Sequence, residues 1–132
     1  MTIRYFIDTD WVIDHLNQIE RVVNRLKELR PEGLGLSIIS LAELYEGVYY
    51  SRDPEASRVA LEAVLEDVSI LGIDEEISKR FGQERGRLRK EGKLIGDLDL
   101  LIGSTALQHN LTVLTNNRRH FEQIEGLQLE SL

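Results

Sequence analysis

Short apolar runs alternate along this chain with longer segments of mixed polarity. The runs at 5–7 and 34–39 are apolar at nearly every position, which is typical of strands covered on both faces of a parallel sheet. Runs of the same kind predict further strands at 68–71 and 111–115, and a weaker pattern predicts a fifth at 127–130.

The segments between these strands have the spacing of amphipathic helices. From 11 to 29 apolar residues recur every three or four positions, over one helix or two consecutive ones, until Pro31 and Gly33 end the pattern. Further helices are predicted at 41–50, 54–65, 75–91, 98–109 and 118–124. Strands and helices that alternate through short connections predict one α/β domain over residues 1–132, with helices on both faces of a parallel sheet of four or five strands.

Composition adds limits to this picture. The chain has 132 residues, 42% hydrophobic and 30% charged, which is ordinary for a soluble domain with one core. It has no cysteine, which excludes disulfides, thiolate metal sites and a cysteine nucleophile. Without a signal-peptide pattern or a long apolar run, we expect a cytoplasmic protein with no membrane partner.

Charge is distributed unevenly. The net charge of −7 argues against a protein that coats nucleic acid nonspecifically, yet seven of the sixteen lysines and arginines lie within 79–93. These bases form either a solvated helix face or a surface that attracts phosphates. With two bases near the end of the chain, the candidate phosphate-binding residues are Arg85, Arg87, Arg89, Lys93, Arg118 and Arg119.

Acidic side chains lie close to the ends of the predicted strands. Asp8 directly follows the first strand, Glu43 lies in the first turn after the second, and Asp99 begins the helix before the fourth. Asn117 follows the fourth strand. Ligands of parallel α/β sheets bind at this edge. Because two carboxylates 4 Å apart repel by about 4 kcal/mol at an effective dielectric of 20, such a cluster needs protons or a cation, and all-oxygen ligands suit Mg²⁺ or Mn²⁺.

Each of these residues also has a structural alternative. Asp8 and Asn117 suit helix N-caps, and Glu43 completes a capping-box pattern with the serine three positions before it. Asp97 likewise suits an N-cap, whereas Asp99 lies in an apolar segment where an unpaired carboxylate is costly. Residues two positions apart on a helix point to opposite faces, so only one of the two aspartates can face the site. Asp99 is assigned to the site in preference to Asp97.

Four motifs then occur in a fixed order. They are Asp8-Thr-Asp10, Ser40-Leu-Ala-Glu-Leu-Tyr-Glu-Gly47, Asp99-Leu-Leu-Ile-Gly-Ser-Thr-Ala106 and Leu111-Thr-Val-Leu-Thr-Asn-Asn117-Arg-Arg-His-Phe121. Over nearly the whole chain they resemble PIN-domain ribonucleases, most closely the VapC-type toxins of bacterial and archaeal toxin–antitoxin pairs. The resemblance implies a PIN-like three-layer α/β/α sandwich. It implies metal binding by Asp8, Glu43 and Asp99, with Asn117 completing the catalytic set.

The resemblance also implies an activity and partners. The activity is hydrolysis of RNA by water activated on Mg²⁺ or Mn²⁺, leaving a 5′-phosphate and a 3′-hydroxyl, with the basic residues above contacting RNA. Thr115 matches a hydroxyl residue near the family's site, and Asp97 and Asp10 are auxiliary acids. The implied partners are a second copy of the chain and a small VapB-like antitoxin that blocks the site with an extended segment.

Two other functions stay open at this stage. A receiver-like phosphoacceptor domain also uses acids and Mg²⁺, but it requires an aspartate after the third strand and a lysine after the fifth. Only Asp74 follows the third strand here, and no lysine follows Lys93. The second alternative is a catalytically silent binding module of the same fold, against which the complete acidic set argues.

Two further patterns predict packing. Gly47 and Gly103 each cost up to about 1 kcal/mol inside a helix, which indicates close approach by another element. Tyr45 and Tyr49 are four positions apart and are expected to stack on one helix face. The three histidines lack the paired spacing of a metal site and are interpreted as surface or capping residues.

Overall fold

The computed structural model describes residues 2–132, in which five strands form one sheet. Its order is β3-β2-β1-β4-β5, and every neighbouring pair is parallel. The strands are β1 (Tyr5–Ile7), β2 (Leu34–Ser37), β3 (Val68–Leu71), β4 (Thr112–Leu114) and β5 (Gln128–Glu130). The predicted parallel sheet is therefore confirmed, with its fifth strand at one edge.

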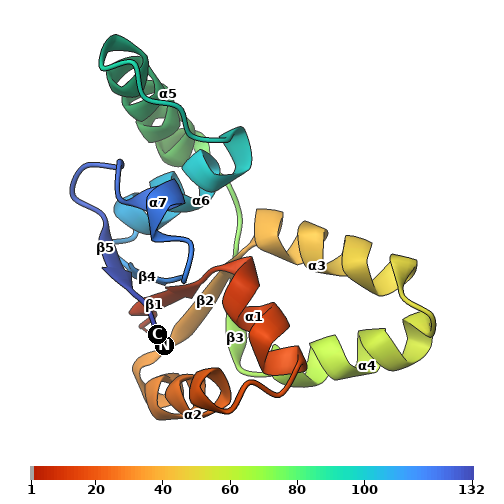
Figure 1. Cartoon of the computed structure of the whole chain (residues 1–132). Helices are drawn as coiled ribbons and strands as arrows, with labels where there is room; N and C mark the ends of the chain where they lie inside the picture. The colour runs from red at the N-terminus through yellow and green to blue at the C-terminus, as the bar shows by residue number, and fades with distance from the viewer. Residues whose placement is uncertain (1) are drawn as a thin grey trace.

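Helices cover both faces of this sheet, as Figure 1 shows. One layer contains α1 (Thr9–Leu16), α2 (Glu20–Leu29), a 3₁₀ turn (Arg30–Glu32), α3 (Ile38–Tyr50) and α4 (Pro54–Val64). The opposite layer contains α5 (Glu75–Lys90), α6 (Asp97–Gln108) and α7 (Arg118–Phe121). This arrangement confirms the predicted three-layer α/β/α sandwich. None of the helices within residues 2–132 is both long and apolar enough to cross a lipid bilayer.

The core is divided between the two faces of the sheet. In β1, Ile7 packs with Trp11 and neighbouring helices on one face, and Phe6 packs with Leu100 and Phe121 on the other. All of these side chains are buried. Because successive residues of a strand point to opposite faces, one short apolar strand supplies both cores, as its composition predicts.

Helix α3 begins three residues before the predicted position. The Ser37 side chain accepts a hydrogen bond from the backbone N–H of Ile39 at 3.0 Å and caps the helix there. Ser40 is then an interior, buried helix residue, so the predicted capping box with Glu43 is wrong. Glu43 is therefore not required to begin the helix, which removes its structural alternative.

Gly103 allows α6 and α7 to pack closely. A Cβ atom at this position would lie 2.4 Å from Cδ1 of Ile124 and 3.7 Å from Cδ1 of Phe121, so the predicted close approach is confirmed. At Gly47, by contrast, a Cβ atom would meet nothing within 4 Å. The second glycine therefore has no packing partner within the described chain.

Gly103→Ala is expected to destabilise the fold by about 1 kcal/mol, since overpacking of 1–3 kcal/mol exceeds the gain in helix propensity. Gly82→Ala, in α5, is the matched control because its Cβ would meet nothing within 4 Å, and we expect it to stabilise the protein slightly. Urea unfolding measures both changes. Equal stabilisation by the two substitutions would contradict the packing argument.

Candidate active site

The site lies where the order of the strands reverses. The chain runs outward from β1 through β2 to β3 and then returns to form β4 on the other side of β1. Ile7 and Leu114 are paired in register, so the residues after them lie side by side at the carboxyl edge. Asp8 follows β1 and Thr115 follows β4, which places both at the topological switch point where α/β folds bind ligands.

Asp8 is buried at this edge, with 5% of its surface exposed, and it caps α1. Its Oδ1 accepts a hydrogen bond from the backbone N–H of Thr9 at 2.8 Å. Its Oδ2 accepts one from the Thr115 hydroxyl, also at 2.8 Å. The cap and the site role predicted for Asp8 are thus compatible, because the two oxygens face different donors.

Burial raises the pKa of Asp8 to about 6. The hydrogen bond from Thr115 lowers this pKa, while the nearby charges of Asp10 and Asp99 raise it. Burial likewise raises the pKa of Asp10 above its usual value. Asp8 and Asp10 are thus close to each other in a poorly solvated place. This is the repulsion between neighbouring carboxylates that the sequence predicted.

Glu43 reaches the site from α3. Its Oε1 accepts a hydrogen bond from the Thr9 hydroxyl at 3.2 Å, which brings it beside the residue that follows Asp8. The side chain is exposed to solvent. Glu43 is therefore free to change partners, whereas Asp8 is fixed.

Asp99 and Asp97 bind different partners, as expected for opposite helix faces. Oδ2 of Asp99 lies 2.8 Å from Nδ1 of His120 in α7, and its side chain is 29% exposed. Asp97 instead accepts a hydrogen bond from Arg85 at 2.5 Å, and its side chain is 81% exposed. The helix cap predicted for Asp97 is wrong, because Gly96 occupies the N-cap position.

The segment between β4 and α7 connects these groups. The backbone N–H of Asn117 donates to the Thr115 hydroxyl at 2.9 Å, and that of Asn116 donates to Oδ2 of Asp10 at 2.9 Å. Asn117 occupies the N-cap position of α7, but its side chain makes no capping hydrogen bond. Its exposed amide is therefore not committed to the helix end.

The donor chemistry fits a hard divalent cation. The acids supply only oxygen donors, which Mg²⁺ and Mn²⁺ prefer, and Oδ1 of Asp10 is buried without a hydrogen-bond partner. Across residues 2–132, however, no three acidic or histidine side chains converge on one point. The carboxylates of Asp8, Glu43 and Asp99 instead contact separate neighbours.

The basic residues predicted to contact RNA divide into two groups. Arg85 is bound to Asp97 and to the carbonyl of Ile95, and Arg87 is bound to Glu84 and Glu91, so both are held within the protein. Those with exposed side chains are Arg89, Lys93, Arg118 and Arg119, although Lys93 pairs with Glu91 at 3.2 Å. Arg118 and Arg119 also line a surface pocket of about 360 Å³ with Asn116, Asn117 and His120. This pocket shares His120 with the acidic site.

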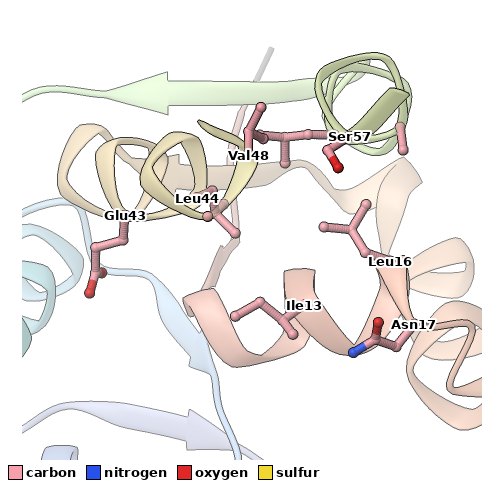
Figure 2. Close-up of a pocket in the computed structure, with 10 residues that line it drawn as sticks. Ile13, Leu16, Asn17, Glu43, Leu44, Val48 and Ser57 are labelled. Atoms are coloured by element: carbon pink, nitrogen blue, oxygen red, sulfur yellow. The ribbon is translucent and has the colours of Figure 1, made fainter. Parts of the chain in front are cut away.

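A second pocket, of about 350 Å³, lies between α1, α3 and α4 (Figure 2). Figure 2 shows Ile13, Leu16 and Leu44 around an open space, with Glu43 at one end. Gly47 also lines the pocket. Close by, Tyr45 and Tyr49 stack as predicted, with ring centroids 6.3 Å apart. An apolar groove therefore leads directly to one of the site carboxylates.

Three contacts were not identified from the sequence: the Thr9 hydroxyl on Glu43, the Asn116 backbone on Asp10, and His120 beside Asp99. Thr9 is flanked by two candidate acids, which is the only local signal for its role. Spacing carries no signal for His120, because the contact joins two helices of the folded chain.

Comparison with known proteins shows similarity in sequence and in fold over nearly the full length of the chain. The family model described as PIN domain matches residues 5–127. Ribonuclease VapC1 of Haemophilus influenzae (strain R2866) is 34% identical over 94% of both chains. The tRNA(fMet)-specific endonuclease VapC of Shigella flexneri is 27% identical over 97% of both chains. The solved complex of VapBC2 from Rickettsia felis, bound to a promoter DNA fragment, contains a chain 31% identical to this one, with a TM-score of 0.91 and coverage of 98% and 99%.

Proposed function

The chain belongs to the PIN domain family of VapC-type ribonucleases, and on that premise we propose that it is a Mg²⁺- or Mn²⁺-dependent endoribonuclease toxin restrained by an antitoxin. The observation that carries the proposal is buried Asp8, whose pKa is raised by burial and, to a smaller extent, by the charges of Asp10 and Asp99. The RNA substrate, the metal ion and the homodimer, which the family resemblance implies, are all part of this proposal.

The residues of the site have separate roles in this reaction. Asp8, Glu43 and Asp99 would hold Mg²⁺ or Mn²⁺, which lowers the pKa of a water ligand and screens the charge on the phosphate. Thr115 fixes the orientation of Asp8 through its hydrogen bond. The free amide of Asn117 is placed to orient water or substrate. No histidine base is required, because activation comes from the cation.

RNA would approach over the exposed bases of the β4–α7 segment. Arg118 and Arg119 line the pocket that adjoins the acids, so they offset negative charge that otherwise repels phosphates. Arg85 and Arg87 are better explained as structural, because ion pairs hold them. Arg89 and Lys93 are exposed and stay candidates for RNA contact.

The antitoxin would occupy the apolar groove between α1, α3 and α4. The groove accepts apolar side chains along Leu16 and Leu44 and ends at Glu43, where a basic side chain of the antitoxin would find a carboxylate. The neighbouring solved structures are toxin–antitoxin complexes, which supports a partner of this kind. Occupation of the groove would also cover the approach to Glu43.

The match to the PIN domain family over residues 5–127 argues against the receiver-like alternative. Asp74, the only aspartate at the strand end that a receiver domain requires, caps α5 by accepting a hydrogen bond from the N–H of Ile77 at 2.8 Å. A silent binding module differs from the proposed toxin only in activity, so a cleavage assay separates the two.

The test mixes purified protein with total RNA, and separately with an initiator tRNA transcript suggested by the relative from Shigella, in Mg²⁺, Mn²⁺ or EDTA. Discrete fragments are expected only when wild-type protein is mixed with RNA in Mg²⁺ or Mn²⁺. None are expected in EDTA or with Asp99→Asn, which keeps the shape of the side chain but removes the negative charge of this metal ligand. Equal cutting by Asp99→Asn would contradict the proposed centre. Absence of cutting by the wild-type protein in either metal would favour the silent module.

A further inference from the structure

We propose that His120 is a positioning residue that orients the Asp99 carboxylate for the divalent cation, an inference that rests on the proposed function. Nδ1 of His120 lies 2.8 Å from Oδ2 of Asp99. Asp99 projects from the first turn of α6, and His120 is its one side-chain polar partner among the described residues. The imidazole occupies one oxygen of the carboxylate and leaves Oδ1 as the oxygen available to a cation.

Close packing of α6 against α7 makes this contact possible. Asp99 and Gly103 are four positions apart and lie on the same face of α6. At Gly103 that face has no side chain, and Ile124 and Phe121 pack directly against it. Phe121 is fully buried, so the core fixes the helix that carries His120. Packing thus fixes the backbone that carries His120, while the imidazole itself stays partly exposed beside Asp99.

The same short segment also orients Asp8. Thr115 donates its hydroxyl to Asp8 and accepts a hydrogen bond from the N–H of Asn117. The N–H of His120 in turn donates to the Asn117 carbonyl at 3.0 Å. Residues 115–120 therefore form one hydrogen-bonded frame that contacts two carboxylates from two different elements. Such a frame fixes both carboxylates relative to each other before a cation binds.

Outer partners of this kind change metal affinity more than they change chemistry, because their mutation typically lowers affinity 10–100-fold. An imidazole that instead competed with the cation for Asp99 would have the opposite effect, and its removal would tighten binding. An imidazole that contacted RNA would leave metal affinity unchanged. The sign of the change in metal affinity therefore distinguishes these roles.

The experiment measures the Kd for Mn²⁺ alone by titration calorimetry, without RNA, on the full chain. His120→Ala is compared with His120→Asn, whose side-chain amide nitrogen takes the place of Nδ1 as a donor. His109→Ala is the matched control, because His109 is an exposed histidine at the other end of α6. Asp99→Asn reports on the proposed metal site itself, and urea unfolding of each metal-free variant reports on the fold.

We expect His120→Ala to raise the Kd for Mn²⁺ about tenfold or more, with unfolding unchanged and with RNA turnover recovering at saturating Mn²⁺. His120→Asn is expected to restore most of the affinity, and His109→Ala to match the wild type. An unchanged or lower Kd in His120→Ala, while Asp99→Asn weakens binding, would overturn the role of His120 alone. If Asp99→Asn also left the Kd unchanged, the proposed metal site would be wrong, and this inference with it.

Discussion

Asp8→Asn is expected to abolish RNA cleavage while making the folded protein more stable. The loss of a charged metal ligand removes several kcal/mol of transition-state stabilisation, which corresponds to roughly a thousandfold in rate. The gain in stability arises because the wild-type protein keeps a buried carboxylate ionised at neutral pH. The amide has nearly the same shape and no charge, its oxygen can still accept from the Thr9 N–H, and its NH₂ group can donate to the Thr115 hydroxyl oxygen.

The sign of the pH dependence follows from the raised pKa of Asp8. Between its usual value of 3.8 and about 6, the folded protein binds a proton that the unfolded chain releases. Stability from this group is therefore fully present below roughly pH 4 and is lost as the pH rises through 6. The loss is on the order of 2 kcal/mol after allowance for partial solvation.

Urea unfolding from pH 4 to pH 8, without divalent metal, measures this effect. Asp8→Asn is expected to be more stable than the wild type at pH 7.5 by about 2 kcal/mol, and the difference is expected to vanish near pH 4. Asp53→Asn is the matched control, because Asp53 is an exposed helix cap of α4 far from the acids. A variant that is less stable than the wild type at pH 7.5 would contradict the interpretation of Asp8.

Gly47→Phe is expected to release the toxin from its antitoxin. The glycine lines the apolar groove, and a side chain there would extend into open space rather than into the protein. The phenylalanine side chain would therefore fill the groove proposed to bind the antitoxin without disturbing the core. Loss of one central contact of at least 2 kcal/mol raises the Kd for the antitoxin about 30-fold or more.

The measurement is the Kd of purified toxin for its cognate antitoxin, followed by RNA cleavage in a mixture of the two. Gly47→Ala is the control, because it adds the helix propensity but little volume. Undiminished affinity of Gly47→Phe would show that the antitoxin binds elsewhere. Equal weakening by Gly47→Ala would point to a change in α3 rather than to a filled groove.

The sequence predicted the sheet well because its strands are covered on both faces. A run such as Tyr5–Ile7 is apolar on either side, and this pattern depends only on local composition. The parallel direction of the strands followed from the alternation with helices, whereas their order was not predicted and came from the structure. The start of α3 was predicted less accurately. Ser37 and Ser40 are both suitable N-cap residues three positions apart, and the folded chain uses Ser37.

The candidate site was predictable as residue types but not as contacts. The family motifs contain Asp8, Glu43 and Asp99, and the switch point explains why Asp8 and Thr115 lie side by side at the carboxyl edge of the sheet. The partners of these acids come from distant segments: Thr115 bonds Asp8 from 107 positions away. Hydrophobic periodicity contains no information about such pairs. His120 was interpreted as a surface residue for this reason, and its side chain is indeed 55% exposed although it contacts Asp99.

The reversal of strand order has a consequence for synthesis on the ribosome. A nascent chain that has reached α6 already contains all three acids, but the neighbour that completes β1 on its second side is still inside the exit tunnel. Without β4 and Thr115, Asp8 lacks its hydroxyl partner and a central strand lies open at one edge. The site can therefore be completed only after β4 and the segment that follows it have left the ribosome.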